Sequence, residues 1–135
     1  MNVQTKVEGL LKKYQGQVQF EDKELTSLDQ LGIDQDSPFH LACFRGDLND
    51  VNIMISAGVD LNHQGDLGDT PLHYAVRMQR ESVVEALLLG GALSDIKNDY
   101  EDTPMDIAKR EGNQKIISLL ERFLNLKRSQ IIPRE

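Results

Sequence analysis

The feature that most constrains the fold of this chain is a short motif that occurs three times at one interval. Its copies read SPFHLA at residues 37–42, TPLHYA at 70–75 and TPMDIA at 103–108, so successive copies begin 33 residues apart. Each begins with a hydroxyl residue and a proline. This pair is typical of a helix start, because the hydroxyl caps the first turn and proline lacks the N–H that would be unpaired there. A repeat of this period predicts a solenoid of stacked units.

The remainder of each unit repeats as well. Gly46 and Gly112 occupy one phase, where a short first helix is expected to end in a left-handed residue, and Gln79 occupies that phase in the middle unit. Apolar residues then recur at the spacing of a second helix. They are Val51, Ile53 and Ile55; Val83, Val84, Leu87 and Leu88; Ile116, Ile117, Leu119 and Leu120. Each unit is therefore predicted to hold two short helices.

Motif, period and helix pattern together resemble the ankyrin-repeat family, whose unit is a β-turn followed by two antiparallel helices. The resemblance covers about residues 32–124. It implies an all-α ankyrin-repeat solenoid with three repeats, at 33–65, 66–98 and 99–124. The third copy departs from the pattern, since Asp106 stands where the others have histidine. In the family that histidine hydrogen-bonds to neighbouring backbone, and a terminal copy has no following turn to bond.

Both ends of the chain lie outside the repeat pattern. Residues 3–14 have the spacing of a helix with one apolar face, made of Val3, Val7, Leu10, Leu11 and Tyr14. We expect this helix to cap the array, followed by an irregular lead-in, the two together filling residues 1–36. Within the lead-in, Val18 and Phe20 suggest a short extended piece, and the leucines at 25, 28 and 31 suggest one or two helical turns ending at Gly32. Residues 125–135 are expected to form a frayed tail.

Composition sets the expected class and location. At 135 residues the chain has the size of a single domain. Its one cysteine, Cys43, excludes an internal disulfide and suits a reducing compartment. The N-terminus lacks the apolar core of a signal peptide, and no apolar run approaches the length of a membrane span. We therefore expect a cytoplasmic protein that is a monomer when free.

The sequence holds few groups with catalytic or metal-binding potential. His40 and Cys43 lie three residues apart and His73 lies one repeat away, but a zinc site needs four convergent ligands. We interpret the two histidines as hydrogen-bonding residues of the motif and Cys43 as a small core residue. No phosphate-binding loop, nucleophile elbow or zinc-protease motif occurs. We expect no cofactor and no enzymatic activity; an active site would have to use residues 16–36.

Charge is unevenly distributed along the chain. Residues 16–96 contain 4 Lys and Arg against 14 Asp and Glu, a local net charge of −10, whereas residues 1–15 carry +2 and residues 97–135 carry +1. A concentrated negative field disfavours nucleic acids and anionic membranes as partners, because both are polyanionic. It favours a basic protein partner.

Acidic residues gather at one position of the repeat. One aspartate directly precedes each Ser/Thr-Pro pair: Asp36, Asp69 and Asp102. Further acidic residues fall in the same turns: Asp34, Asp66, Asp99 and Glu101. Because stacked helices lie on the order of 10 Å apart, the first three aspartates are expected to form a column at the turn tips. Two interpretations remain open, since aspartate is a good turn former and an acidic column also suits a basic partner.

The family resemblance places binding on the exposed face of the first helices, beside these turns. The matching positions are Phe44, Arg45, Arg77, Met78, Arg110 and Glu111, with Leu67 and Tyr100 at two turn tips. Four of these residues are apolar, and four apolar residues on one concave surface are typical of anchors within a charged rim. The alternative is that Phe44 and Met78 pack against the neighbouring helix.

These observations predict a non-enzymatic protein-binding module that presents an acidic concave face and turn tips to a basic protein. With one small domain and no second domain to scaffold, binding itself is the expected function, as in an inhibitor. Small ankyrin proteins of this size resemble bacterial immunity proteins, which neutralise a toxic effector, often a basic nuclease. A regulatory adaptor that masks a signalling or transcription partner is the alternative, and a structural spacer is a third possibility.

Overall fold

The computed structural model describes residues 2–17, 20, 24–32 and 35–131, the last four of these by backbone only. Its α-helices are α1 (Val3–Gln15), α2 (Pro38–Arg45), α3 (Leu48–Ser56), α4 (Pro71–Arg77), α5 (Glu81–Leu89), α6 (Pro104–Glu111) and α7 (Gln114–Ile131), with a 3-10 turn, η2 (Asp66–Gly68). The described residues contain no strand. Val18, one of the two residues of the expected extended piece, and the turn aspartate Asp34 lie outside these residues. Phe20, the other residue of that piece, has a 3-10 conformation, so the prediction of an extended piece is wrong there.

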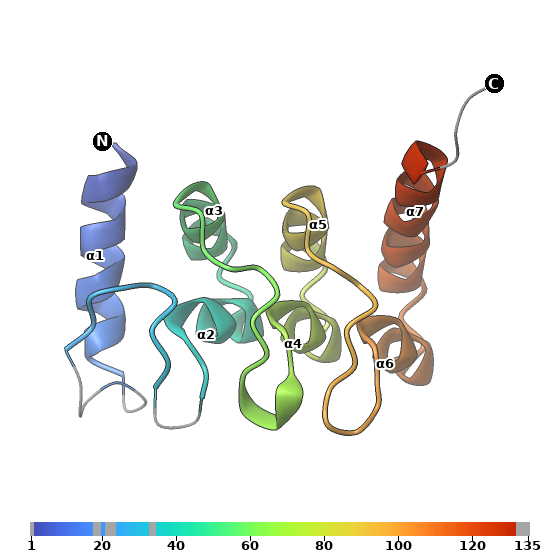
Figure 1. Cartoon of the computed structure of the whole chain (residues 1–135), viewed down its shortest axis with the longest axis horizontal. Coiled ribbons are helices and arrows are strands. Elements are labelled where there is room, and N and C mark those ends of the chain that lie inside the picture. The colour runs from blue at the N-terminus through green and yellow to red at the C-terminus, as the bar shows by residue number, and fades with distance from the viewer. Residues whose placement is uncertain (1, 18–19, 21–23, 33–34, 132–135) are drawn as a thin grey trace.

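The helices form two rows (Figure 1). The first helices of the repeats, α2, α4 and α6, lie side by side in one row, and α1, α3, α5 and α7 stand in the other. The turns that lead into α2, α4 and α6 project from the first row. This arrangement confirms the predicted all-α solenoid of three repeats with an N-terminal capping helix. None of the described helices is long and apolar enough to cross a membrane.

The motif starts each first helix as its chemistry predicts. Pro38, Pro71 and Pro104 are the first helical residues, and the hydroxyl before each accepts a hydrogen bond from the N–H three residues on. The predicted left-handed residues follow the first helices of all three repeats. Gly46 has φ 75° and Gly112 has φ 72°, while Gln79, with φ 56°, adopts the same conformation despite its side chain.

Two histidines, His40 and His73, bind the first helices of the first and second repeats to backbone carbonyls farther along the chain. The N–H of Ser37 donates to His40 Nδ1 at 3.1 Å, so the ring proton is on Nε2, which donates to the His63 carbonyl at 2.7 Å. In the second repeat His73 Nε2 donates in the same way to the Asp102 carbonyl at 2.8 Å. Both rings are buried. Burial lowers the pKa of both histidines, because it disfavours the charged form.

The third repeat ends this series of hydrogen bonds. Asp106 Oδ2 accepts the Thr103 N–H at 2.9 Å, so it completes the same helix cap, but it is exposed and reaches no further turn. The backbone hydrogen bond from Thr103 lowers the pKa of Asp106. The substitution seen in the sequence thus keeps the cap and drops the contact to a next repeat.

Helix α1 is fastened to the start of α3. Tyr14 is 1% exposed, and its hydroxyl donates to Asp50 at 2.8 Å. Lys13 Nζ lies 2.6 Å from the same carboxylate and 3.1 Å from Asp47, the N-cap of α3. The apolar face predicted for this helix is incomplete at its start, because Val3 is 43% exposed.

The helical turns expected between Leu25 and Gly32 do not form. This prediction is wrong: residues 24–32 contain a turn at positions 28–29 but no helix. The side chain of Gln30 takes up local backbone groups, accepting the Thr26 N–H at 3.0 Å and donating to the Glu24 carbonyl at 3.0 Å. Side-chain hydrogen bonds of this kind compete with helix formation. Leu25 is buried nevertheless.

The frayed tail expected from residue 125 is also wrong for the described residues, because α7 continues to Ile131. Residues 121–131 contain neither glycine nor proline, so nothing in this stretch breaks the helix. Helix α7, at 18 residues, is therefore twice as long as α3 or α5, each of which has 9.

Candidate partner-binding site

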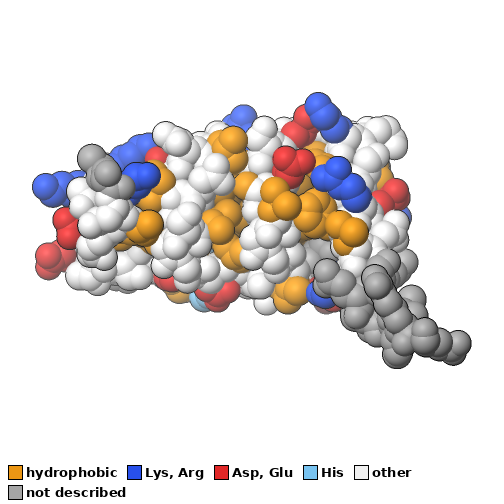
Figure 2. Space-filling view, turned by 90° about the horizontal axis from the view of Figure 1, so that it is seen from above, with side chains coloured by type: hydrophobic (Ala, Val, Ile, Leu, Met, Phe, Trp, Pro, Cys, Tyr) orange, Lys and Arg blue, Asp and Glu red, His pale blue; other side chains and the backbone are white. Residues whose placement is uncertain are grey.

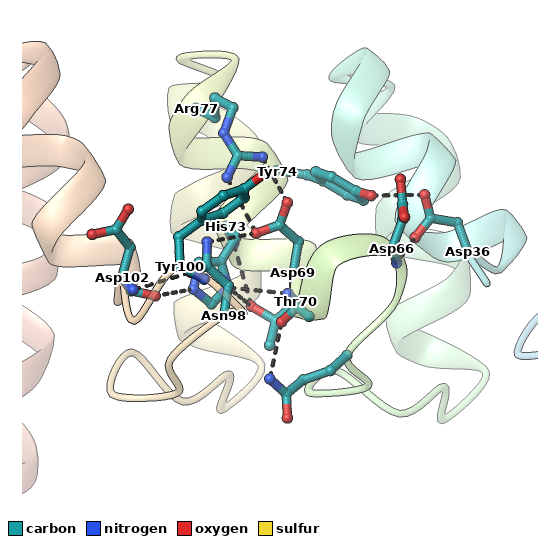
Figure 3. Close-up of polar contacts among 12 residues, drawn as sticks. Asp36, Asp66, Asp69, Thr70, His73, Tyr74, Arg77, Asn98, Tyr100 and Asp102 are labelled. Carbon is teal, nitrogen blue, oxygen red and sulfur yellow. Dashed lines mark hydrogen bonds and ion pairs between the residues drawn. The ribbon is translucent and has the colours of Figure 1, made fainter. Parts of the chain in front are cut away.

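In the second repeat, the aspartate before the Thr-Pro pair is clamped by an arginine eight residues later (Figure 3). Arg77, the last residue of α4, donates through both Nη atoms to the two oxygens of Asp69, at 2.8 and 3.1 Å. Asn98, from the next turn, donates to Asp69 Oδ1 at 3.0 Å. The side chain of Asp69 is 3% exposed and that of Arg77 is 36% exposed. The hydrogen bond to Asp69 raises the pKa of Arg77, so the guanidinium stays charged.

The third repeat has the same clamp in a more open setting. Arg110 donates through both Nη atoms to Asp102, at 3.0 and 2.8 Å. Here the aspartate side chain is 19% exposed and that of the arginine is 65% exposed. The hydrogen bond from Arg110 lowers the pKa of Asp102.

The first repeat has no arginine at this position, because Phe44 stands eight residues after Asp36. A neighbouring repeat supplies the partners instead: the Tyr74 hydroxyl donates to Asp36 Oδ2 at 2.7 Å and the Asp66 N–H donates to Oδ1 at 3.0 Å. Burial, followed by the hydrogen bond to Asp36, raises the pKa of Tyr74. Phe44 and Tyr74 meet edge to face with ring centroids 5.7 Å apart.

A hollow of about 470 Å³ lies between the second and third turn tips, on the face formed by α2, α4, α6 and the turns before them. We call this surface the first-helix face. Eight residues line the hollow: Leu67, Asp69, Arg77, Tyr100, Asp102, Ile107, Arg110 and Glu111. The two aspartate–arginine clamps form part of its walls. The structure therefore brings together seven residues that the sequence analysis named for partner binding, all of the lining except Ile107.

Two apolar side chains border this hollow in exposed positions. Leu67 is 49% exposed and Tyr100, its equivalent one repeat later, is 67% exposed. Leu67 is held at φ 55°, and the carbonyl of Leu67 accepts the Asp99 N–H at 3.0 Å. The two turn tips are thus tied together by backbone, which positions both anchors relative to one another.

The other predicted residues lie outside the hollow. Phe44 is 40% exposed at the far end of the first-helix face, and Met78 is half-buried at the end of α4. The guanidinium of Arg45 donates a hydrogen bond to the side-chain oxygen of Gln17, in the lead-in, at 2.7 Å. Asp66 and Asp99 are exposed at their turn tips.

The acidic column differs from the expectation in one respect. Asp69 is not an exposed tip residue, since it is buried and held by Arg77 and Asn98. Asp102 is neutralised by Arg110 in the same way. Much of the acidic charge exposed at these turns is carried by Asp66, Asp99 and Glu101, the last of which lies 3.7 Å from Lys97.

Sequence reasoning missed two kinds of residue in this region. Ile107 is buried and lines the hollow. Asn98 is buried in the next turn and donates a hydrogen bond to Asp69, which also lines the hollow. Tyr74 supports Asp36 from a position that is leucine in the first repeat and isoleucine in the third. A hydroxyl at an otherwise apolar repeat position was the signal that could have identified Tyr74.

The groups considered for metal binding have other contacts. Both ring nitrogens of His40 and of His73 are used in the hydrogen bonds described above. Cys43 is fully buried, and burial raises the pKa of its thiol. Within the part of the chain that the structure describes, no three His, Cys, Asp or Glu side chains are grouped so that they could hold a metal ion.

Comparison with known proteins agrees with this architecture. No curated protein matches the chain. A family model described as ankyrin repeats (3 copies) matches residues 6–98 and 39–128, which together span most of the sequence. The chain belongs to the ankyrin-repeat family.

Proposed function

We propose that this chain, a protein–protein interaction module by its repeats, binds a basic protein through the first-helix face and thereby inhibits that protein. The proposed site is the hollow between the second and third turn tips together with Leu67 and Tyr100 on its border. In this proposal the chain acts by occlusion and catalyses nothing, and it works in the reducing cytoplasm, where its buried free Cys43 stays reduced.

The observation that carries the proposal is the pair of exposed apolar anchors beside charged clamps. Binding energy at protein interfaces is concentrated in a few buried side chains, often aromatic, surrounded by polar groups that exclude water. Tyr100 and Leu67 supply such anchors, and the two clamps supply the polar surroundings. The clamps also hold the walls in place before binding, which reduces the entropy lost on association.

Charge supports a basic partner over other classes. The net charge is −7 overall and −10 across residues 16–96. A field of this sign raises the rate at which a basic protein arrives and slows the approach of nucleic acids and anionic membranes. Because the clamps neutralise Asp69 and Asp102, the steering charge in this proposal is carried by Asp66, Asp99 and Glu101.

Affinity purification from the native host provides the partner, and kinetics with the purified pair test the proposal. Tyr100→Ala is expected to speed dissociation at least tenfold, since truncating an anchor acts mainly on the off-rate. An Asp66→Asn, Asp99→Asn double variant is expected to slow association at 0.01 M salt and to change it little at 0.15 M, where the Debye length is about 8 Å. Arg122→Ala, at a distant ion pair with Glu85, is the control.

The same experiment separates the inhibitor from the alternative. Loss of the partner's own activity on binding supports an inhibitor of a toxic effector, whereas a partner that stays active but changes location or partners supports a regulatory adaptor. Wild-type kinetics for Tyr100→Ala contradict the assignment of the hollow as the binding site. Association rates that do not depend on salt contradict the basic partner.

A further inference from the structure

A second hollow, of about 420 Å³, lies between the end of α5 and the second half of α7, at the edge of the array farthest from the turn tips (Figure 1). Residues Leu88, Leu89 and Ala92 line it from the α5 side, and Phe123, Leu124 and Leu126 line it from α7. Figure 2 views the molecule from this edge, and apolar side chains are gathered over its α5–α7 half. We call this hollow the α5–α7 groove.

Two leucine side chains that line this groove are largely exposed to water, which is unfavourable for an apolar side chain. Leu89 is 71% exposed and Leu126 is 53% exposed. Leu89 is the most exposed large apolar side chain among the described residues. Single exposed leucines need no explanation, but two that border one apolar hollow form a patch of the kind that marks an interaction site.

The unequal lengths of the helices create this surface. Helix α5 ends at Leu89, whereas α7 continues to Ile131, so the second half of α7 extends beyond the helix packed against it. Figure 1 shows the same difference, with α7 rising above α5. The segment that carries Leu126 and Lys127 therefore has the groove on one side and no following repeat on the other.

The rim of the groove carries two opposite charges. Asp95, in the loop after α5, and Lys127, on α7, are both exposed. Within the described part of the chain neither of them belongs to an ion pair or accepts or donates a side-chain hydrogen bond. Several other exposed charges on the second helices are paired, for example Glu85 with Arg122 at 3.5 Å and Glu81 with Lys115 at 3.3 Å.

We propose that the α5–α7 groove binds a second copy of this chain, related by a two-fold axis. In a two-fold interface one patch meets itself, so residue i contacts residue j and residue j contacts residue i. A patch that carries one acidic and one basic side chain on the rim of an apolar centre is complementary to itself. Leu126 of one copy packs beside Leu89 of the other, and Asp95 of each copy pairs with Lys127 of its partner.

This proposal departs from the monomer expected from the sequence, and it is independent of the proposed function. The first-helix face lies away from the groove, so the dimer presents two partner-binding hollows. Linking two such sites raises the effective affinity for a partner that offers two copies of its epitope.

Sedimentation equilibrium on the full chain is the first test. The wild type is expected to show the mass of two chains, in a concentration-dependent equilibrium with one chain. Leu89→Lys is expected to give one chain at all concentrations, since it places a cation in the apolar centre at an exposed helix end that tolerates lysine. A wild-type mass of one chain at roughly 1 mM, where even weak dimers form, overturns the proposal and leaves the groove to another protein.

Charge exchange provides the sharper test. Asp95→Lys alone places lysine against lysine at both symmetric contacts, and Lys127→Asp alone places aspartate against aspartate, so each variant is expected to be monomeric. Mixing the two variants restores an attractive pair, because the lysine that replaces Asp95 in one chain then meets the aspartate that replaces Lys127 in the other. At the second contact the unchanged Lys127 and Asp95 meet as in the wild type. We expect a mixed dimer from two monomeric proteins.

Two outcomes are decisive in that test. Dimers in either single variant, or no dimer in the mixture, overturn the two-fold arrangement. Leu67→Asp is the matched control, because it changes an exposed leucine on the first-helix face, at a left-handed position that aspartate tolerates. Leu67→Asp is expected to leave the dimer intact and to weaken partner binding. Leu89→Lys is expected to abolish the dimer and to leave the partner-binding hollow unchanged.

Discussion

The junction between the first and second repeats and the junction between the second and third each use a histidine hydrogen bond to a backbone carbonyl, at different positions of the repeat, and they hold the preceding aspartate differently. At the first junction, Asp36 is held across the repeat boundary by the hydroxyl of Tyr74. At the second, Asp69 is held within its own repeat by Arg77, and Asn98 reaches it from the following turn. The aspartate before the Ser/Thr-Pro pair thus bonds to the neighbouring repeat at the first junction and forms an ion pair within its own repeat at the second.

The difference has a consequence for the surface. With Tyr74 bridging to Asp36, and Phe44 against the tyrosine ring, the first junction is filled by aromatic side chains. Ile107 replaces the tyrosine at the second junction, and it is too short to bridge and carries no hydroxyl. The Asp69–Arg77 and Asp102–Arg110 clamps are not bridged to one another by an aromatic side chain, and the hollow bordered by Leu67 and Tyr100 lies between them. On the first-helix face, the hollow thus lies at the junction where isoleucine stands in place of the tyrosine.

Asp69→Ala is expected to have the largest effect on stability. The variant leaves the half-buried guanidinium of Arg77 without its carboxylate and removes the acceptor of Asn98, so the free energy of unfolding should fall by about 3 kcal/mol. Urea unfolding measures this. Asp102→Ala is the matched control and should change the midpoint far less, because Arg110 is 65% exposed and returns to water. Equal losses in the two variants would show that the burial of Asp69 does not matter.

Acid should weaken both junctions. The folded state lowers the pKa of His40 and His73, so the unfolded chain binds more protons below pH 6.5; stability is complete above that pH and is lost as the pH falls. Between pH 7.5 and 5.5 we therefore expect the free energy of unfolding to fall. Denaturant titrations at the two pH values measure the difference.

The third repeat serves as the internal control for that pH dependence. Asp106, the counterpart of the histidines, has a lowered pKa, so its contribution is present above the ordinary aspartate range and is lost only in stronger acid. Replacing His73 with Gln should therefore reduce the change between pH 7.5 and 5.5, and replacing Asp106 with Asn should leave that change as it was. A pH-independent midpoint between these values contradicts the neutral-histidine contacts.

Tyr74→Phe tests the bridge at the first junction. Removing the hydroxyl takes a hydrogen bond from the Asp36 carboxylate, and we expect a loss of about 1.5 kcal/mol, typical of a hydrogen bond to a charged group. Thermal or urea unfolding measures it. Tyr100→Phe is the control, because that tyrosine is 67% exposed and its variant should unfold like the wild type. The same behaviour for both variants would mean that the bridge contributes nothing.

Phe44→Arg has the smallest expected effect and the most direct bearing on the comparison. It places an arginine eight residues after Asp36, which reproduces the spacing of the clamps in the other two repeats. The new pair is exposed and the ring contact with Tyr74 is lost, so the net change should stay within about 0.5 kcal/mol. In the Tyr74→Phe background, however, the same change should recover part of the lost stability, and a double-mutant cycle measures that coupling.

The sequence by itself determined the repeat architecture. Period, Ser/Thr-Pro starts and left-handed positions such as Gly46, Gln79 and Gly112 act within a few residues of chain, so local chemistry is enough to place the helices. The same locality explains why Asp106 keeps a helix cap after losing the histidine. Where the motif is absent, the helical turns predicted within residues 24–32 did not form, because the side chain of Gln30 bonds local backbone groups and leucine spacing alone does not show such bonds.

Only the tertiary structure decided what the aspartates of the motif do. Asp36, Asp69 and Asp102 occupy the same position of the repeat, yet one is bridged by tyrosine, one is buried in a clamp and one lies in an open clamp. Their partners come from the next turn or from the end of the helix, and the strength of an ion pair depends on how much water the surrounding packing removes. The burial of each aspartate depends on how the repeats stack, so it cannot be derived from the sequence of one repeat.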